Sequence, residues 1–253
     1  VCRILRQLRW VLYPRRCPFC DRVLGTVSPC PDCCAELDAL RRKPTMRLSA
    51  ELHYLGRLEG AAAPYRYAGC VRRGVLRAKY QATPWAADEL GAEMARLLFG
   101  SEAKMGTFGP EVQPVPGLAL SYDCIVPVPA SSRARYNVPE RMARPIARAV
   151  GVPLEPKALV RVHAARRQEG LSLDERLANV AGAFAVPDPE RVEGKRVLLV
   201  DDVITTGATA AACAQALLAA GAQSIFAVAL ATVEFDARPQ PSAQIHENSE
   251  EEN

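Results

Sequence analysis

The run from Arg196 to Val200 gives the strongest fold signal in this 253-residue chain, because four consecutive apolar residues lead directly into Asp201 and Asp202. A loop of small and hydroxylated residues, Thr205 to Thr209, follows and opens an Ala-rich stretch that predicts a helix stopped by Gly221. Uninterrupted apolar strands are typical of parallel sheets that are buried on both faces. In such sheets the chemistry gathers at the carboxyl ends of the strands. The sequence therefore predicts an α/β fold with a functional site just beyond this strand.

Strand and helix patterns alternate elsewhere in the chain, as expected for a mostly parallel sheet with helices on both faces. The segment from Arg41 to Pro64 lacks firm periodicity and is interpreted as a connector, and Gly100 to Leu120 is rich in Gly and Pro, which predicts a loop. Strands are expected at Tyr65–Tyr67, Tyr122–Val128, Ala158–Val162 and Ser224–Val233, and helices at Val71–Lys79, Leu90–Leu98 and Val138–Val150.

The stretch from Val200 to Thr209 has the chemistry of a phosphate cradle. Backbone N–H groups, Thr hydroxyls and a helix N-terminus attract phosphate, and Gly207 permits close backbone approach. Two acids beside the loop would repel a bare phosphate, so the ligand should also carry neutral hydroxyls, as ribose 5-phosphate does. The acids would then bind the ribose hydroxyls and stabilise positive charge near C1′. The alternative is an acid pair that holds Mg²⁺ in another phosphotransfer fold, with the loop acting only as a helix cap.

Cysteines near the N-terminus form two Cys-x-x-Cys pairs that are separated by nine residues. This spacing predicts one tetrahedral zinc held by Cys17, Cys20, Cys30 and Cys33. Cys34 is an alternative to Cys33 as the fourth ligand, and a redox pair or disulfides are the alternative to a metal. A module this small needs such a staple because it is too short for a core of its own.

Composition indicates an ordinary globular protein, with 49% apolar and 24% charged residues. The charge is uneven: residues 1–80 contain 16 Lys and Arg against 6 Asp and Glu, which leaves 16 against 22 for the remainder. A basic first third is compatible with a polyanion-binding face and equally with a solvated surface. We expect a cytoplasmic protein without membrane insertion, because no apolar stretch approaches a span or a signal peptide.

Several motifs in a fixed order resemble the ComF/ComFC competence family, and the resemblance extends from Cys17 to Phe235. The motifs are the double Cys-x-x-Cys, Ile125–Pro129, the basic loop with Arg133 and Arg135, Tyr136–Asn137, Arg161, Arg167–Gln168, Leu171, Arg176, Asn179, Gly182, Phe184 and the cradle. The chain departs from the family in the loop at Arg135–Pro139, where the family tends to read Arg-Gly-Phe-Asn-Gln.

The resemblance implies a type I phosphoribosyltransferase fold with a mobile hood, plus a small N-terminal zinc ribbon with four cysteine ligands. The chain is expected to divide into a module at 1–40, a phosphoribosyltransferase-like domain at 41–235 and an acidic tail at 236–253, whose composition predicts disorder. The implied ligand is phosphoribosyl pyrophosphate (PRPP) with Mg²⁺, and zinc is structural. The implied site consists of Asp201 and Asp202 as catalytic, ribose-binding acids; of Val203, Ile204, Thr205, Thr206, Gly207, Ala208, Thr209, Pro129, Ala130, Arg133 and Arg135 as PRPP-binding residues; and of Arg167 and Gln168 in the hood.

Three functions are compatible with these features. In the first, the protein binds single-stranded DNA and PRPP and acts in DNA uptake during natural transformation. In the second, it is an active phosphoribosyltransferase with an unidentified nitrogen acceptor. In the third, it is an adaptor for a DNA-uptake helicase or other ATPase.

Overall fold

Helices and strands alternate along the computed structural model, which describes residues 16–24, 30–43, 45–81, 83–100, 122–130, 134–162 and 182–233. The first half of the described chain contains α2 (Cys34–Leu40), β1 (Gly60–Ala62), β2 (Tyr65–Arg66), α3 (Gly69–Tyr80) and α4 (Pro84–Phe99). The second half contains β3 (Cys124–Pro127), α5 (Val138–Val150), β4 (Val160–Arg161), β5 (Phe184–Ala185), η1 (Pro189–Arg191), β6 (Arg196–Ile204), α7 (Ala208–Ala219) and β7 (Ser224–Thr232).

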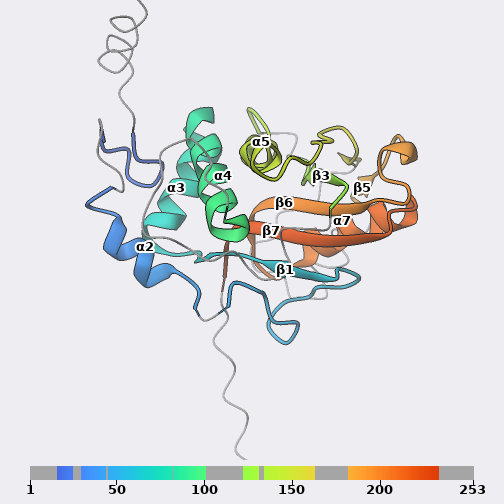
Figure 1. Cartoon of the computed structure of the whole chain (residues 1–253), viewed down its shortest axis with the longest axis horizontal. Coiled ribbons are helices and arrows are strands. Elements are labelled where there is room, and N and C mark those ends of the chain that lie inside the picture. The colour runs from blue at the N-terminus through green and yellow to red at the C-terminus, as the bar shows by residue number, and fades with distance from the viewer. Residues whose placement is uncertain are drawn as a thin grey trace, which may run out of the picture.

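The main sheet is parallel throughout, with the order β1-β7-β6-β3 and with β2 also paired to β7 (Figure 1). Its centre is the β6–β7 ladder, which runs from Arg196 opposite Ser224 to Ile204 opposite Thr232. β4 pairs with β5 in a separate antiparallel ribbon, so the strand expected at Ala158–Val162 forms outside the main sheet. The expected α/β class with a parallel sheet is confirmed.

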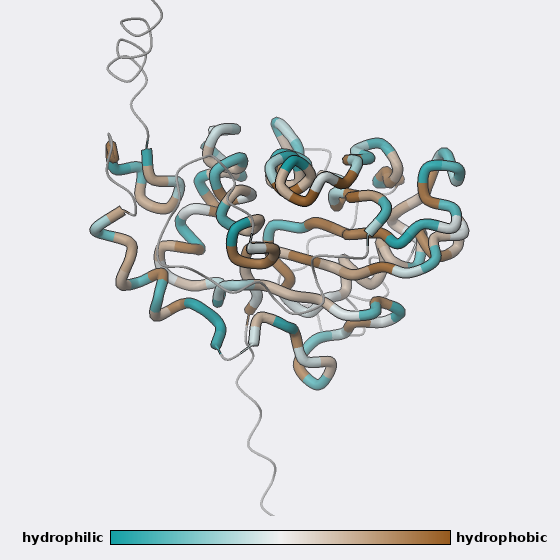
Figure 2. The backbone as a smooth tube through the Cα atoms, viewed as in Figure 1, coloured by the Kyte–Doolittle hydropathy of each residue, from teal (hydrophilic) through white to brown (hydrophobic). Residues whose placement is uncertain are grey.

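Both faces of the sheet are buried, and the side chains of β6 alternate between two apolar clusters. Leu198 and Val200 join the cluster beneath α3, α4 and α5, whereas Val197 and Leu199 join the cluster beneath α7. This alternation follows from the two-residue repeat of a strand. Hydrophobic colour accordingly concentrates along the central strands in Figure 2, with more hydrophilic stretches outside. The run of apolar residues in β6 therefore serves two cores at once.

The cysteine module packs directly on α3 and shares its core. Phe19 and Cys17 are fully buried in the same cluster as the residues of α3 and α4. At Gly74 an added Cβ would lie 3.0 Å from the Phe19 ring and 3.1 Å from the Pro18 carbonyl oxygen, so a larger residue would require these neighbours to shift. Glu36 of α2 accepts a hydrogen bond of 2.9 Å from the backbone N–H of Cys70 in the first turn of α3. The module is thus continuous with the main core.

Two details differ from the expectations. β6 does not end at Val200, because its ladder with β7 continues through Val203 and Ile204, so the two acids lie within the strand. The connector expected at Arg41–Pro64 contains β1, which extends the sheet beyond β7. The helix stop at Gly221 is confirmed, since this residue adopts φ +90° directly after the last helical turn.

Candidate phosphoribosyl-binding site

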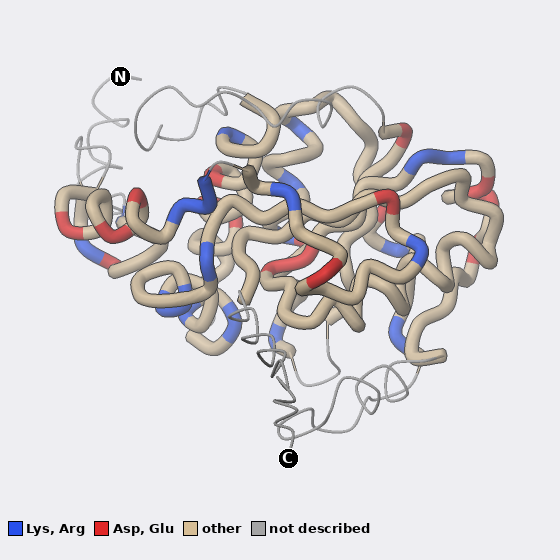
Figure 3. The backbone as a smooth tube through the Cα atoms, turned by 90° about the horizontal axis from the view of Figure 1, so that it is seen from below, with Lys and Arg blue, Asp and Glu red and all other residues tan. Residues whose placement is uncertain are grey.

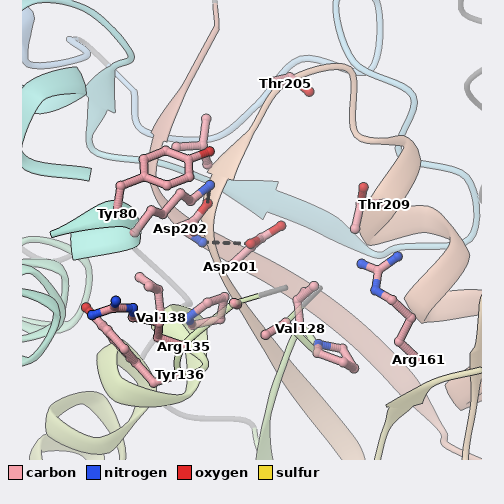
Figure 4. Close-up of a pocket in the computed structure, with 16 residues that line it drawn as sticks. Tyr80, Val128, Arg135, Tyr136, Val138, Arg161, Asp201, Asp202, Thr205 and Thr209 are labelled. Atoms are coloured by element: carbon pink, nitrogen blue, oxygen red, sulfur yellow. Dashed lines mark hydrogen bonds and ion pairs between the residues drawn. The ribbon is translucent and has the colours of Figure 1, made fainter. Parts of the chain in front are cut away.

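A pocket of about 520 Å³ lies at the carboxyl ends of β3 and β6, where ligands bind in parallel α/β sheets. Figure 4 shows its lining side chains converging from four parts of the chain: the end of α3, the segment after β3, the ribbon strand β4, and the end of β6 with the loop that follows. The lining consists of Lys79, Tyr80, Val128, Pro129, Ala130, Ala134, Arg135, Tyr136, Val138, Pro139, Arg161, Asp201, Asp202, Val203, Thr205 and Thr209.

The two acids are consecutive residues of β6, and both line the pocket although they contact different neighbours. Asp202 is buried on the side of α3, where its Oδ1 atom lies 2.8 Å from Nζ of Lys79. Asp201 is half-buried and accepts a hydrogen bond of 2.8 Å from the backbone N–H of Asp202. Burial and the carboxylate of Asp202 raise the pKa of Asp201 to about 7, although Lys79 and Arg161 oppose the shift. The pair therefore holds a single charge readily but resists a second one.

The loop at the start of α7 depends on glycine at its N-cap position. Gly207 is the N-cap residue of α7 with φ +87°, a left-handed conformation that favours glycine. An added Cβ at Gly207 would lie 2.3 Å from the carbonyl oxygen of Tyr54, and the Tyr54 N–H donates to Thr206 O at 2.8 Å. Thr205 and Thr209 project into the pocket from either end of the loop (Figure 4). The first turn of α7 adds backbone donors and the positive end of its dipole.

Two cations complete the described lining on either side of the acids. Arg161 lies with its guanidinium carbon 4.5 Å from the centre of the Phe184 ring, and its Nε atom is buried without a hydrogen-bond partner in the described parts of the chain. Figure 4 shows this guanidinium directed toward Thr209. Arg135 lies on the opposite side of the pocket, next to Tyr136. Positive charge is thus available at both ends of a ligand that spans the acids.

Most of the residues predicted for this site line the pocket: Asp201, Asp202, Val203, Thr205, Thr209, Pro129, Ala130 and Arg135. Four others belong to the same stretch of chain but do not line the pocket, namely Ile204, Thr206, Gly207 and Ala208. Arg133, Arg167 and Gln168 lie outside the described residues. Lys79 and Tyr80 also line the pocket and were not among the predicted site residues. The spacing offered a signal for Lys79, because it follows Val71 and Val75 at four-residue intervals on the buried face of the helix.

The four predicted cysteine ligands form one cluster, with all sulfur atoms within 4.8 Å of one another. Cys17 and Cys33 approach to 3.9 Å, and Cys20 and Cys30 to 3.6 Å. A tetrahedral zinc with Zn–S bonds of about 2.3 Å places its sulfurs about 3.8 Å apart, so the cluster fits this ion. Cys34 is exposed and lies in α2, outside the cluster, so the geometry favours Cys33 as the fourth ligand.

Comparisons with known proteins agree with this architecture. Residues 139–246 match the family model "Phosphoribosyl transferase domain". The DNA utilization protein YhgH of Salmonella typhimurium is 36% identical over 142 residues, which cover 54% of this chain and 58% of the relative. Competence protein F of Haemophilus influenzae is 34% identical over 92 residues, which cover 34% of this chain and 40% of the relative. The chain spans about half the length of the curated relatives it matches.

Among solved structures, the glutamine PRPP amidotransferase from B. subtilis is similar, with a TM-score of 0.36 and 24% identity over 60% of this chain and 30% of that one. The match of residues 139–246 and the parallel strand order agree with the expected type I phosphoribosyltransferase fold. In sequence the chain is similar to DNA utilization protein YhgH and to competence protein F, in agreement with the resemblance that its motifs indicated. In the described residues, no helix is long and apolar enough to cross a membrane.

Proposed function

We propose that this protein binds PRPP with Mg²⁺ in the pocket at the ends of β3 and β6. The main support is that one pocket is lined both by an acid pair at the end of a strand and by threonines of a loop at a helix N-terminus. The loop suits a phosphate and the acids suit hydroxyls, and PRPP presents these groups side by side. The remaining wall, formed by residues 129–130 and 134–135, suits a second anionic group.

Each part of the ligand has a partner in this arrangement. Thr205, Thr209 and the first N–H groups of α7 bind the 5-phosphate, and Arg161 offsets its charge. Asp201 and Asp202 accept hydrogen bonds from the ribose hydroxyls and stabilise positive charge at C1′. The segment from Pro129 to Arg135 binds the pyrophosphate, whose charge Mg²⁺ neutralises when it is bound. Both carboxylates face the pocket close to this position, so the donor set is compatible with a ligand-borne magnesium ion.

Titration calorimetry with PRPP and Mg²⁺ tests the proposal. We expect the double variant Asp201→Asn, Asp202→Asn to lose at least about 100-fold in affinity while it keeps the fold, because both side chains face the pocket. The matched control is Asp188→Asn, which removes an acid that pairs with Arg191 beside η1, away from the pocket lining. Equal affinities for the wild type and the double variant would reject the assignment.

We also propose a role in DNA uptake during natural transformation, with single-stranded DNA as a partner, action in the cytoplasm and a DNA-uptake ATPase as a possible associate. Support comes from the names of the relatives and from the basic first third of the sequence. The fold neutralises part of that charge, since Arg16, Arg22, Lys43 and Arg73 pair with acids. Figure 3 shows basic and acidic positions interspersed along the described backbone.

Fluorescence anisotropy with a labelled single-stranded oligonucleotide tests DNA binding. The titration is made at two salt concentrations, each with and without PRPP and Mg²⁺. Affinity that falls steeply with salt supports contacts with phosphates, and a change on adding PRPP shows that the two ligands are thermodynamically coupled. Salt-independent binding, or none, contradicts this part of the proposal.

An active transferase is the second candidate function, and Tyr80 favours it. Its side chain is 76% exposed, the highest value among the exposed large hydrophobic residues of the described chain, and it lines the pocket. A free ring at this position offers a stacking surface for a planar nitrogen base. Release of pyrophosphate from PRPP that depends on an added nucleobase and falls in Tyr80→Ala supports turnover. No release with any of the common bases contradicts it.

We further propose that Cys17, Cys20, Cys30 and Cys33 hold a structural zinc ion. Their deprotonated sulfurs would bind the ion, and the ion would supply folding free energy to a module that otherwise relies on its contact with α3. Metal analysis of the purified protein tests the stoichiometry, which we expect to be one zinc per chain.

A further inference from the structure

Lys79 reaches the pocket from α3, outside the residues that match the phosphoribosyl transferase model. Its Nζ atom lies 2.8 Å from Oδ1 of Asp202, and its side chain is only 34% exposed. A lysine on the inner face of a helix loses hydration, which opposes its charge, yet the acids of β6 raise its pKa above the ordinary value. Lys79 therefore remains a cation inside the pocket.

The end of α3 is fixed from two sides, so this position of Lys79 is built into the fold. On the pocket side, the hydroxyl of Tyr136 donates a hydrogen bond to the carbonyl oxygen of Ala78. On the opposite side, Nη1 of Arg77 donates to the carbonyl oxygen of Pro18 at 3.2 Å. The last turn of α3 therefore contacts Tyr136, which follows the segment proposed for the pyrophosphate, and also contacts Asp202.

The distribution of charge on the ligand favours a movement of the Lys79 side chain toward the pyrophosphate. PRPP carries more negative charge on its pyrophosphate than on its 5-phosphate, and Arg161 faces the threonine loop at the 5-phosphate end (Figure 4). Among the described lining residues, the cations left for the pyrophosphate are Arg135 and Lys79. While Lys79 is paired to Asp202, that carboxylate is also less available to a ribose hydroxyl. A flexible four-carbon side chain can exchange one anion for the other without backbone movement.

We propose that Lys79 is a pyrophosphate-binding residue, which pairs with Asp202 in the empty pocket and transfers its ammonium group to a pyrophosphate oxygen when the ligand enters. The transfer releases Asp202 to accept a hydrogen bond from the ribose. This inference rests on the proposed function and extends it to a residue of α3. The competing role is permanent pairing, in which Lys79 only neutralises Asp202 and never touches ligand.

Calorimetry with three ligands separates the two roles: PRPP with Mg²⁺, pyrophosphate with Mg²⁺, and ribose 5-phosphate. We expect Lys79→Met to lower the affinity for PRPP and for pyrophosphate by about 10- to 100-fold, the range of a charge-assisted hydrogen bond. The affinity for ribose 5-phosphate should fall by less than about threefold. Lys79→Arg retains the charge, and we expect it to recover part of the loss. Arg72→Met is the matched control, since it removes an exposed cation from α3 that does not line the pocket.

Asp202→Asn is a second variant that should affect the ligands in the opposite order, so the test does not depend on the folding of the lysine variant alone. With the lysine unpaired, we expect pyrophosphate to bind at least as tightly as to the wild type, while ribose 5-phosphate binds more weakly. Unchanged PRPP affinity in Lys79→Met, or an equal loss for all three ligands, overturns the inference. If the wild type itself does not bind PRPP, the proposed function fails first, so the two failures are distinguishable.

Discussion

Asp201 is expected to lower the stability of the fold at neutral pH, and its replacement by Asn should therefore stabilise the protein. In the folded chain its pKa is raised from the ordinary 3.8 to about 7 by burial and by Asp202. This difference corresponds to about 4 kcal/mol of free energy between the two protonation states. Asp201 is only half-buried and its surroundings relax around a charge, so we expect about half of this value, or about 2 kcal/mol.

The pH dependence has a definite sign. The folded state keeps the Asp201 proton up to a pH near 7, whereas the unfolded chain loses it near pH 4. Folding thus binds a proton between these values, and this contribution to stability is present below pH 4 and lost as the pH rises toward 7. Asn has no such proton and can still accept the hydrogen bond from the Asp202 backbone that Asp201 accepts. The advantage of Asp201→Asn should therefore grow between pH 5 and pH 8.

Urea denaturation of wild type and Asp201→Asn at several pH values between 5 and 8 measures this difference. Asp123→Asn is a control of opposite sign, because hydrogen bonds from Arg196 lower the pKa of Asp123 to about 2. Its charged form favours the folded state, so its loss should destabilise the protein at neutral pH. A variant at Asp201 that is less stable than wild type at pH 8, or an advantage that does not vary with pH, would refute the reasoning.

Two further predictions concern the loop and the cysteine module. Gly207→Ala should lower the free energy of unfolding by about 2–4 kcal/mol, because the residue has φ +87° and an added Cβ would lie only 2.3 Å from the Tyr54 carbonyl oxygen. Gly151→Ala is the control, since Gly151 has φ +71° but nothing within 4 Å of an added Cβ, and it should lower the free energy of unfolding by only about 1 kcal/mol. Thermal denaturation of both variants measures the difference. Replacement of Cys17 and Cys20 by Ser should abolish zinc binding in metal analysis and lower the melting temperature, since the module shares its core with α3. A wild-type protein without zinc, or equal costs at the two glycines, would contradict these expectations.

The sequence predicted what depends on local pattern. The helix at Val138–Val150 has the bounds of α5, and the apolar run of β6, the stop at Gly221 and the four cysteines are all found where expected. These features follow from spacing, glycine conformation and strand burial, which neighbouring residues determine.

What the sequence did not predict depends on contacts between distant segments. Val203 and Ile204 extend β6 because β7 continues alongside them, and β1 forms because it pairs with β7 across more than half of the chain. Lys79 becomes a pocket residue only when α3 is brought beside Asp202. Periodicity placed this lysine on the inner face of the helix, but only the sheet order determines which acid it meets.

Hydrogen–deuterium exchange with and without PRPP and Mg²⁺ tests the central claim most directly, because it reports both binding and location. We expect slower exchange in peptides that cover Thr205–Thr209, residues 128–130 and 134–136, and the last turn of α3, with smaller effects in the cysteine module. The same protection should be absent in the double variant Asp201→Asn, Asp202→Asn. No protection by PRPP, or protection confined to residues outside the pocket, would contradict the account.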